Sequence, residues 1–120
     1  MDFLDISLFF SILLCALAAG FILTYAIIVM PGLSKLDDKE FIKAFQVTDG
    51  IIQNNQPIFI LIWVGSIISV LCTIITSILS LGIVEAWLII FAGVIYLLGV
   101  QVITISIHLP LNKHIQKIDI

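Results

Sequence analysis

His108 and Asp49 are the residues of this chain best placed to act as general bases, because each lies where a polar segment meets a long apolar run. Histidine and carboxylate side chains beside a substrate can remove a proton from it, so these two are the candidate catalytic residues. Carboxamide side chains can donate hydrogen bonds to a developing oxyanion. The candidate substrate-binding residues are therefore the carboxamides Gln53, Asn54, Gln101 and Asn112.

The spacing of these residues predicts that they share one site. Two sets of polar residues follow i, i+3, i+7 spacing, so each set lies on one face of a helix. The first set is Gln46, Asp49 and Gln53. The second set is Gln101, Thr104 and His108. A polar side chain inside a bilayer is costly unless it has a partner, so the two faces are expected to meet in a polar pocket at one membrane depth. The alternative is structural, because polar residues gather wherever helix ends meet water.

The composition indicates that these residues are carried by membrane-spanning helices. Hydrophobic residues make up 62% of the chain, charged residues 11%, and the mean hydropathy is +1.29. A soluble domain carries roughly 25% charged residues, and a membrane-spanning helix needs about 20 apolar ones. Continuous apolar runs predict spans over about 6–31, 57–81 and 85–109, and their lack of alternation argues against a transmembrane barrel. The chain is expected to form a single integral membrane domain over 1–120.

The polar segment between the first two spans predicts an amphipathic helix over about 37–54. Asp37 has the properties of an N-cap, with Glu40 as its capping-box partner. Phe41 and Phe45 form part of an apolar stripe along one side. Such a helix is expected to lie at the membrane surface. The predicted fold is therefore an all-α bundle of three transmembrane helices and one interfacial helix.

The positive charges predict the orientation of the chain in the membrane. The chain has no arginine, and its lysines are Lys35, Lys39, Lys43, Lys113 and Lys117. With three spans all of them fall on one side, which the positive-inside rule places in the cytoplasm. The amino terminus is then outside. The net charge of −3 includes no basic patch, so the lipid bilayer is the expected partner and nucleic acid is not.

Small residues predict where the first two spans pack. Ala16 and Gly20 are four residues apart in the first span, and Gly65 and Ser69 are four apart in the second. Small faces let helix backbones approach closely in lipid. We therefore expect the Gly65 side of the second span to contact the Ala16 side of the first.

Three motifs give the chain a resemblance to a known family. They are Val-Met-Pro-Gly-Leu at 29–33, the Phe-Gln and Asn-Asn-Gln-Pro-Ile-Phe elements of 45–59, and Thr…His-Leu-Pro-Leu-Asn at 104–112. Over about 15–115 the chain resembles the anthrone-oxygenase-like family of small integral membrane proteins, most of whose bacterial members are uncharacterised. That family usually continues into a Trp- and Arg-containing segment and a fourth span. This chain ends at Ile120, so we expect either a truncated form or a member with three spans.

The resemblance implies a function and a location. Fungal members of the family oxidise anthrones to anthraquinones with molecular oxygen and without an organic cofactor. By resemblance, this chain would be an oxygen-dependent oxidase or oxygenase of a lipophilic aromatic molecule in a bacterial inner membrane. His108 or Asp49 would remove a proton, and the resulting carbanion would react with oxygen. No cofactor is predicted; a metal ion at His108 stays an open alternative, although no HxxxH, HExxH or CxxC spacing supports it.

The alternative to an enzyme is a non-catalytic membrane subunit or a small-ligand-binding protein. In that case the polar residues at the helix ends only fasten the helices to one another. The expected partners are then a lipophilic small molecule, a second copy in a homo-oligomer, or another membrane protein. An enzyme should have an enclosed pocket against His108, whereas a structural subunit should have its polar groups saturated by one another.

Overall fold

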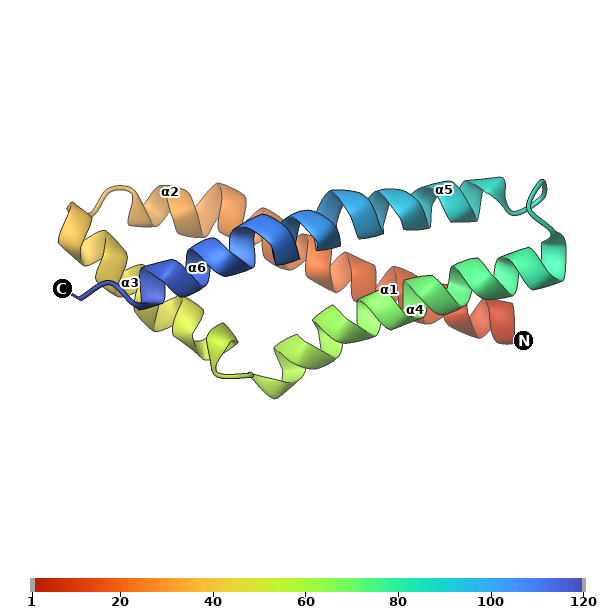
Figure 1. Cartoon of the computed structure of the whole chain (residues 1–120), viewed down its shortest axis with the longest axis horizontal. Coiled ribbons are helices and arrows are strands. Elements are labelled where there is room, and N and C mark those ends of the chain that lie inside the picture. Colours follow the sequence, from red (N-terminus) through yellow and green to blue (C-terminus); the bar gives the residue numbers. More distant parts are fainter. Residues whose placement is uncertain (1, 120) are drawn as a thin grey trace.

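The computed structural model describes residues 2–119, and these contain helices and no β-strand. Three helical stretches are long and apolar enough to cross a membrane: Phe3–Leu33, Pro57–Leu81 and Trp87–Gln116. A shorter helix connects the first stretch to the second (Figure 1). The prediction of an all-α membrane protein with three spans is confirmed.

The first and third spans each contain a π-helical turn just before a proline. The first span consists of α1 (Phe3–Thr24), η1 (Tyr25–Val29) and α2 (Met30–Leu33); the third consists of α5 (Trp87–Tyr96), η2 (Leu97–Val102), η3 (Thr104–His108) and α6 (Leu109–Gln116). Proline has no N–H to donate to the preceding turn, and a wider turn lets the helix accommodate the missing bond. The helices therefore pass Pro31 and Pro110 and extend beyond residues 31 and 109.

The second span, α4 (Pro57–Leu81), forms its most extensive contact with α1 (Figure 1). Pro57 is its first residue, as predicted, and the Gln56 side chain caps it by accepting a hydrogen bond from the Phe59 N–H at 2.7 Å. The buried residues of the two helices are mostly small: Ser7, Ser11 and Ala18 on α1, and Ser66, Val70, Thr73 and Ser77 on α4. Small side chains let the two backbones approach closely, which stabilises helix pairs in lipid.

The face of α1 that packs is not the predicted one. Ala16 and Gly20 are exposed, and a Cβ atom added at Gly20 would meet nothing within 4 Å. A Cβ atom at Gly65 would lie 3.2 Å from Leu14 Cδ1, so Gly65 does face α1, but it faces a different residue. Gly65 was thus predicted correctly, but its partner face on α1 was not, because small residues occur on several sides of α1 and their spacing alone does not identify the side that packs.

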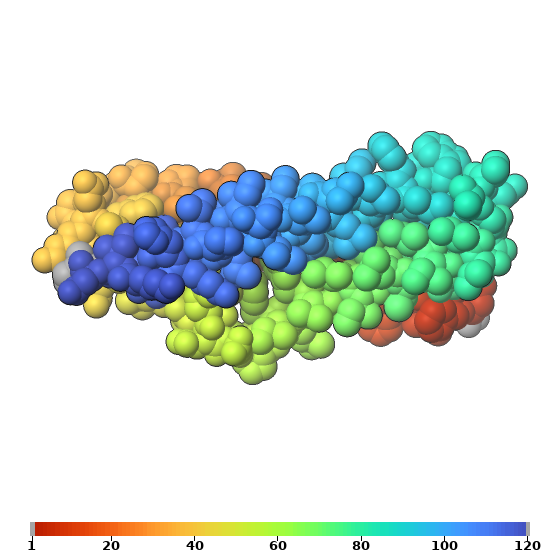
Figure 2. All heavy atoms as spheres, in the orientation of Figure 1, coloured from red at the N-terminus to blue at the C-terminus, as the bar shows by residue number. Residues whose placement is uncertain are grey.

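The third span lies against the rest of the molecule at two places. α5 packs on α4, and α6 packs on the connecting helix α3 (Asp38–Gln53). Figure 2 shows the third span, cyan to blue, lying across the near face of the molecule beside α4, in green. The third span therefore contributes to both ends of the bundle.

The connecting helix α3 begins as the sequence predicts. Asp37 is its N-cap, and the Asp37 carboxylate accepts a hydrogen bond from the Glu40 N–H at 2.8 Å. Phe45 and Asp49 are buried, whereas Lys43 on the same helix is exposed. Figure 1 shows α3 returning from the end of α2 toward the start of α4. Its buried side faces α6 and carries the predicted acid.

Candidate functional site

Two of the predicted site residues are joined at the buried face of α3. Asp49 is only 3% exposed, and its Oδ2 accepts a hydrogen bond from Gln53 Nε2 at 3.2 Å. A second carboxamide, Gln116 Nε2, lies 3.4 Å from the same oxygen. The Asp49 carboxylate is thus held by two side-chain amides at the junction of α3 and α6.

Glutamine side chains hold α3 and α6 together at this junction. Gln46 Nε2 donates to the backbone oxygens of Ile115 and Ile118, at 2.8 and 2.9 Å. Gln116 Nε2 in turn donates to the backbone oxygen of Gln46 at 2.9 Å. The Ile115 oxygen also accepts from the Ile118 N–H at 3.1 Å, so Gln46 adds a second bond to it and binds the Ile118 oxygen just beyond the end of α6. These bonds fasten the end of the third span to α3.

The other predicted residues at this end of the molecule do not join Asp49. His108 and Asn54 are exposed, and Asn112 is partly exposed. Among residues 2–119, no hydrogen bond connects His108 or Asn112 to Asp49 or Gln53. Of the described residues predicted to surround a shared pocket at this end, hydrogen bonds therefore join only Asp49 and Gln53.

The continuation of the third helix explains this difference. The helix passes Pro110 and ends at Gln116, so Gln116 reaches Asp49 in place of His108. Gln116 lies about 12 Å further along the axis than His108, at 1.5 Å per residue. The sequence prediction placed the end of the span near residue 109 and so did not include Gln116, which is the residue of this span that bonds to Asp49.

Gln101 lies deeper in the third span and has the partner that the prediction required. It is 3% exposed, and its Nε2 donates to the Tyr96 hydroxyl at 2.8 Å. The Tyr96 hydroxyl is also 2.6 Å from Ser66 Oγ, which lies 2.7 Å from the Trp63 backbone oxygen. Gln101 Oε1 is buried without a hydrogen-bond partner. A polar chain thus crosses from the third span to α4 within the bundle.

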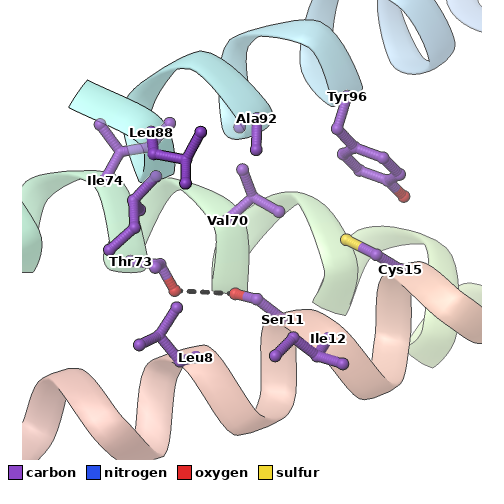
Figure 3. A pocket seen from close by; sticks show the side chains of 12 residues that line it. Leu8, Ser11, Ile12, Cys15, Val70, Thr73, Ile74, Leu88, Ala92 and Tyr96 are labelled. Atoms are coloured by element: carbon purple, nitrogen blue, oxygen red, sulfur yellow. Dashed lines mark hydrogen bonds between the residues drawn. The ribbon is translucent and has the colours of Figure 1, made fainter. Parts of the chain in front are cut away.

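A pocket of about 340 Å³ lies between α1, α4 and α5 (Figure 3). Its wall is mostly aliphatic and is formed by Leu8, Ser11, Ile12, Cys15, Val70, Thr73, Ile74, Leu88, Ile89, Ala92, Gly93 and Tyr96. Ser11 Oγ and Thr73 Oγ1 are joined by a 2.8 Å hydrogen bond across the helix pair. Cys15 and Tyr96 lie together at one end of the pocket in Figure 3. The pocket therefore combines an apolar wall with a few polar groups.

None of the predicted catalytic or substrate-binding residues lines this pocket. Its polar residues had no signal of their own in the sequence, because Ser11 and Thr73 resemble any small hydroxyl residue of a packed membrane helix. Tyr96 offered the best indication. It lies inside an apolar run, five residues before Gln101, where a tyrosine hydroxyl needs a hydrogen-bond partner.

The described residues 2–119 contain no group of three or more His, Cys, Asp or Glu side chains placed to hold a metal ion. Cys15 and Cys72 are both free thiols. The chemistry of the pocket is thus that of aliphatic groups, hydroxyls and one thiol. No family model, curated protein or solved structure matches this chain.

Proposed function

We propose that this integral membrane protein binds a small lipophilic molecule in the pocket between α1, α4 and α5. The observation that supports this function is the pocket itself, with its volume of about 340 Å³ and its aliphatic wall. Ligand sites are typically cavities of roughly 300–1,000 Å³ with apolar walls and a small number of placed polar groups. Ser11, Thr73 and Tyr96 are the polar groups here.

The bilayer is the source from which such a ligand would enter. Ile12 and Leu88 line the pocket, yet they are 68% and 61% exposed. They belong to two spans, so their exposed surfaces face the apolar surroundings of those spans. A molecule dissolved in the hydrocarbon region would reach the pocket from the side, without crossing water.

The oxidation of a lipophilic aromatic molecule, implied by the resemblance, has less support from this geometry. A general base must lie within hydrogen-bond reach of the proton that it removes. The pocket wall contains no histidine and no carboxylate, while His108 is exposed and Asp49 is engaged by Gln53 at the α3–α6 junction. Ligand binding is therefore the function proposed.

Alkylation of Cys15 tests the proposal, because Cys15 lines the pocket and Cys72 does not. In a Cys72→Ala variant in detergent, the rate of N-ethylmaleimide modification would be measured with decane, 2-decanone or 1-decanol present. We expect at least one of these probes to slow modification by roughly fivefold or more at saturation, because an occupied pocket excludes the reagent. The matched control is Leu98→Cys in a background lacking Cys15 and Cys72, since Leu98 is 60% exposed and does not line the pocket. Equal rates at Cys15 with and without all three probes would contradict the proposal.

The orientation in a bacterial inner membrane is also proposed, with the lysine-bearing ends in the cytoplasm. Its support is the placement of all the lysines on one side of the three spans. We expect Lys39→Cys to be labelled by a membrane-impermeant maleimide only from the cytoplasmic side, and Val84→Cys only from outside. Right-side-out and inverted vesicles provide the measurement. Labelling of both variants from the same side would contradict the orientation.

A further inference from the structure

We infer that the pocket selects a lipophilic molecule that donates a hydrogen bond, such as a long-chain alcohol, over one that only accepts, such as a ketone of equal length. The inference rests on the proposed binding function and names the chemical class of its ligand. It comes from the direction of the hydrogen bonds made by the hydroxyl groups on the pocket wall, which are those of Ser11, Thr73 and Tyr96.

The hydroxyl protons of Ser11 and Thr73 are both already donated to partners within the protein. Thr73 Oγ1 lies 2.8 Å from the backbone oxygen of Ser69, and a carbonyl oxygen can only accept. The Thr73 proton must therefore be donated to Ser69. Ser11 Oγ lies 2.8 Å from Thr73 Oγ1, so Ser11 must donate to Thr73. What Ser11 still presents to the pocket is lone pairs.

The hydroxyl proton of Tyr96 is also donated to a partner within the protein. Ser66 Oγ donates to the Trp63 carbonyl at 2.7 Å, so the 2.6 Å bond between Ser66 and Tyr96 must have Tyr96 as its donor. Gln101 Nε2 donates to the Tyr96 hydroxyl from behind the pocket wall, at 2.8 Å. The second lone pair of the Tyr96 oxygen faces the Cys15 thiol, which is only a weak donor, and Gln101 itself does not line the pocket.

The polar part of the wall is thus made of acceptors, together with the Cys15 thiol, which is a weak donor. A ketone entering this pocket from the hydrocarbon region would find no strong donor for its carbonyl oxygen. An alcohol of the same length would donate its proton to Ser11 Oγ or Tyr96 Oη. Discrimination of this kind follows from the groups that the wrong ligand leaves unpaired.

The experiment compares 1-decanol with 2-decanone in the Cys15 alkylation assay, in the Cys72→Ala variant and at equal concentrations in the detergent phase. A net hydrogen bond of about 1 kcal/mol corresponds to roughly a fivefold difference in affinity. We therefore expect 1-decanol to give half-protection at about one fifth of the concentration that 2-decanone requires. Equal potency of the two probes would overturn the inference while leaving the binding function in place. Failure of both, and of decane, would overturn the binding function itself.

Two variants locate the acceptor. Ser11→Ala removes one set of lone pairs, and the Thr73 proton keeps its Ser69 partner, so folding should be preserved. Tyr96→Phe removes the other acceptor. We expect that in one of the two variants 1-decanol and 2-decanone protect Cys15 at about equal concentrations. A full preference in both would overturn the assignment of the acceptor to the pocket wall.

Discussion

Replacing Gly93 by leucine is expected to lower the free energy of unfolding by about 1–3 kcal/mol, the usual range for overpacking in a filled interior. A Cβ atom at Gly93 would lie 2.6 Å from Ile74 Cδ1 and 2.9 Å from Ile74 Cγ1. Val70 Cγ1 would lie 3.2 Å away. A side chain at Gly93 must displace the Ile74 and Val70 side chains of α4, so the leucine should weaken the packing of α5 on α4. Gly93 also lines the pocket, and protection of Cys15 by 1-decanol should be lost as well.

Gly99→Leu is the matched control, because Gly99 lies on the same span and a Cβ atom there would meet nothing within 4 Å. Stability would be measured by titration from mild detergent into sodium dodecyl sulfate, with helicity as the signal. The control should be no less stable than the wild-type protein, since glycine is itself a poor helix former. Equal losses in the two variants would show that α5 does not pack on α4 as described.

Ala18→Leu is expected to have a comparable effect on the other helix pair. Ala18 is 0% exposed and lies on α1, the helix that forms the most extensive contact with α4. Because Ala18 is fully buried, an isobutyl group there must displace its neighbours, and we expect a loss of about 1–3 kcal/mol. The same detergent titration provides the measurement.

Ala19→Leu tests whether the loss of stability is specific to the buried side of α1. Ala19 is the next residue along α1, and it is exposed. A leucine there should leave the unfolding curve almost unchanged, because the side chain enters lipid or detergent. A large loss for Ala19→Leu and none for Ala18→Leu would place a different side of α1 against α4, since neighbouring residues of a helix are about 100° apart.

The sequence was sufficient for the architecture because that information is local. Uninterrupted apolar runs require spans of a certain length, and the Asp37 cap of α3 and the position of Pro57 at the start of α4 follow from short patterns. Gln101 was correctly expected to need a partner, and it has Tyr96. Each of these features depends on residues that are close together in the chain.

The candidate site could not be predicted in the same way, because it depends on how far each helix continues. Pro110 suggested an end to the third span, but the π-helical turn before it lets the helix reach Gln116. Gln116 therefore contacts Asp49, and His108 is left exposed. The pocket had no local signal, because its wall is formed only when α1, α4 and α5 pack together.

Photo-crosslinking of a ligand in the membrane is the most direct test of the binding pocket. A diazirine-bearing ten-carbon alcohol would be irradiated with the protein in vesicles, and the modified residues would be located by mass spectrometry. The proposed function predicts crosslinks on the residues of α1 and α5 that line the pocket, and their loss in excess 1-decanol; these residues are Leu8, Ser11, Ile12, Cys15, Leu88, Ile89, Ala92, Gly93 and Tyr96. Modification spread evenly over lipid-facing residues such as Leu61 and Leu79, which are 68% and 82% exposed, and unaffected by 1-decanol, would contradict a binding site between these helices.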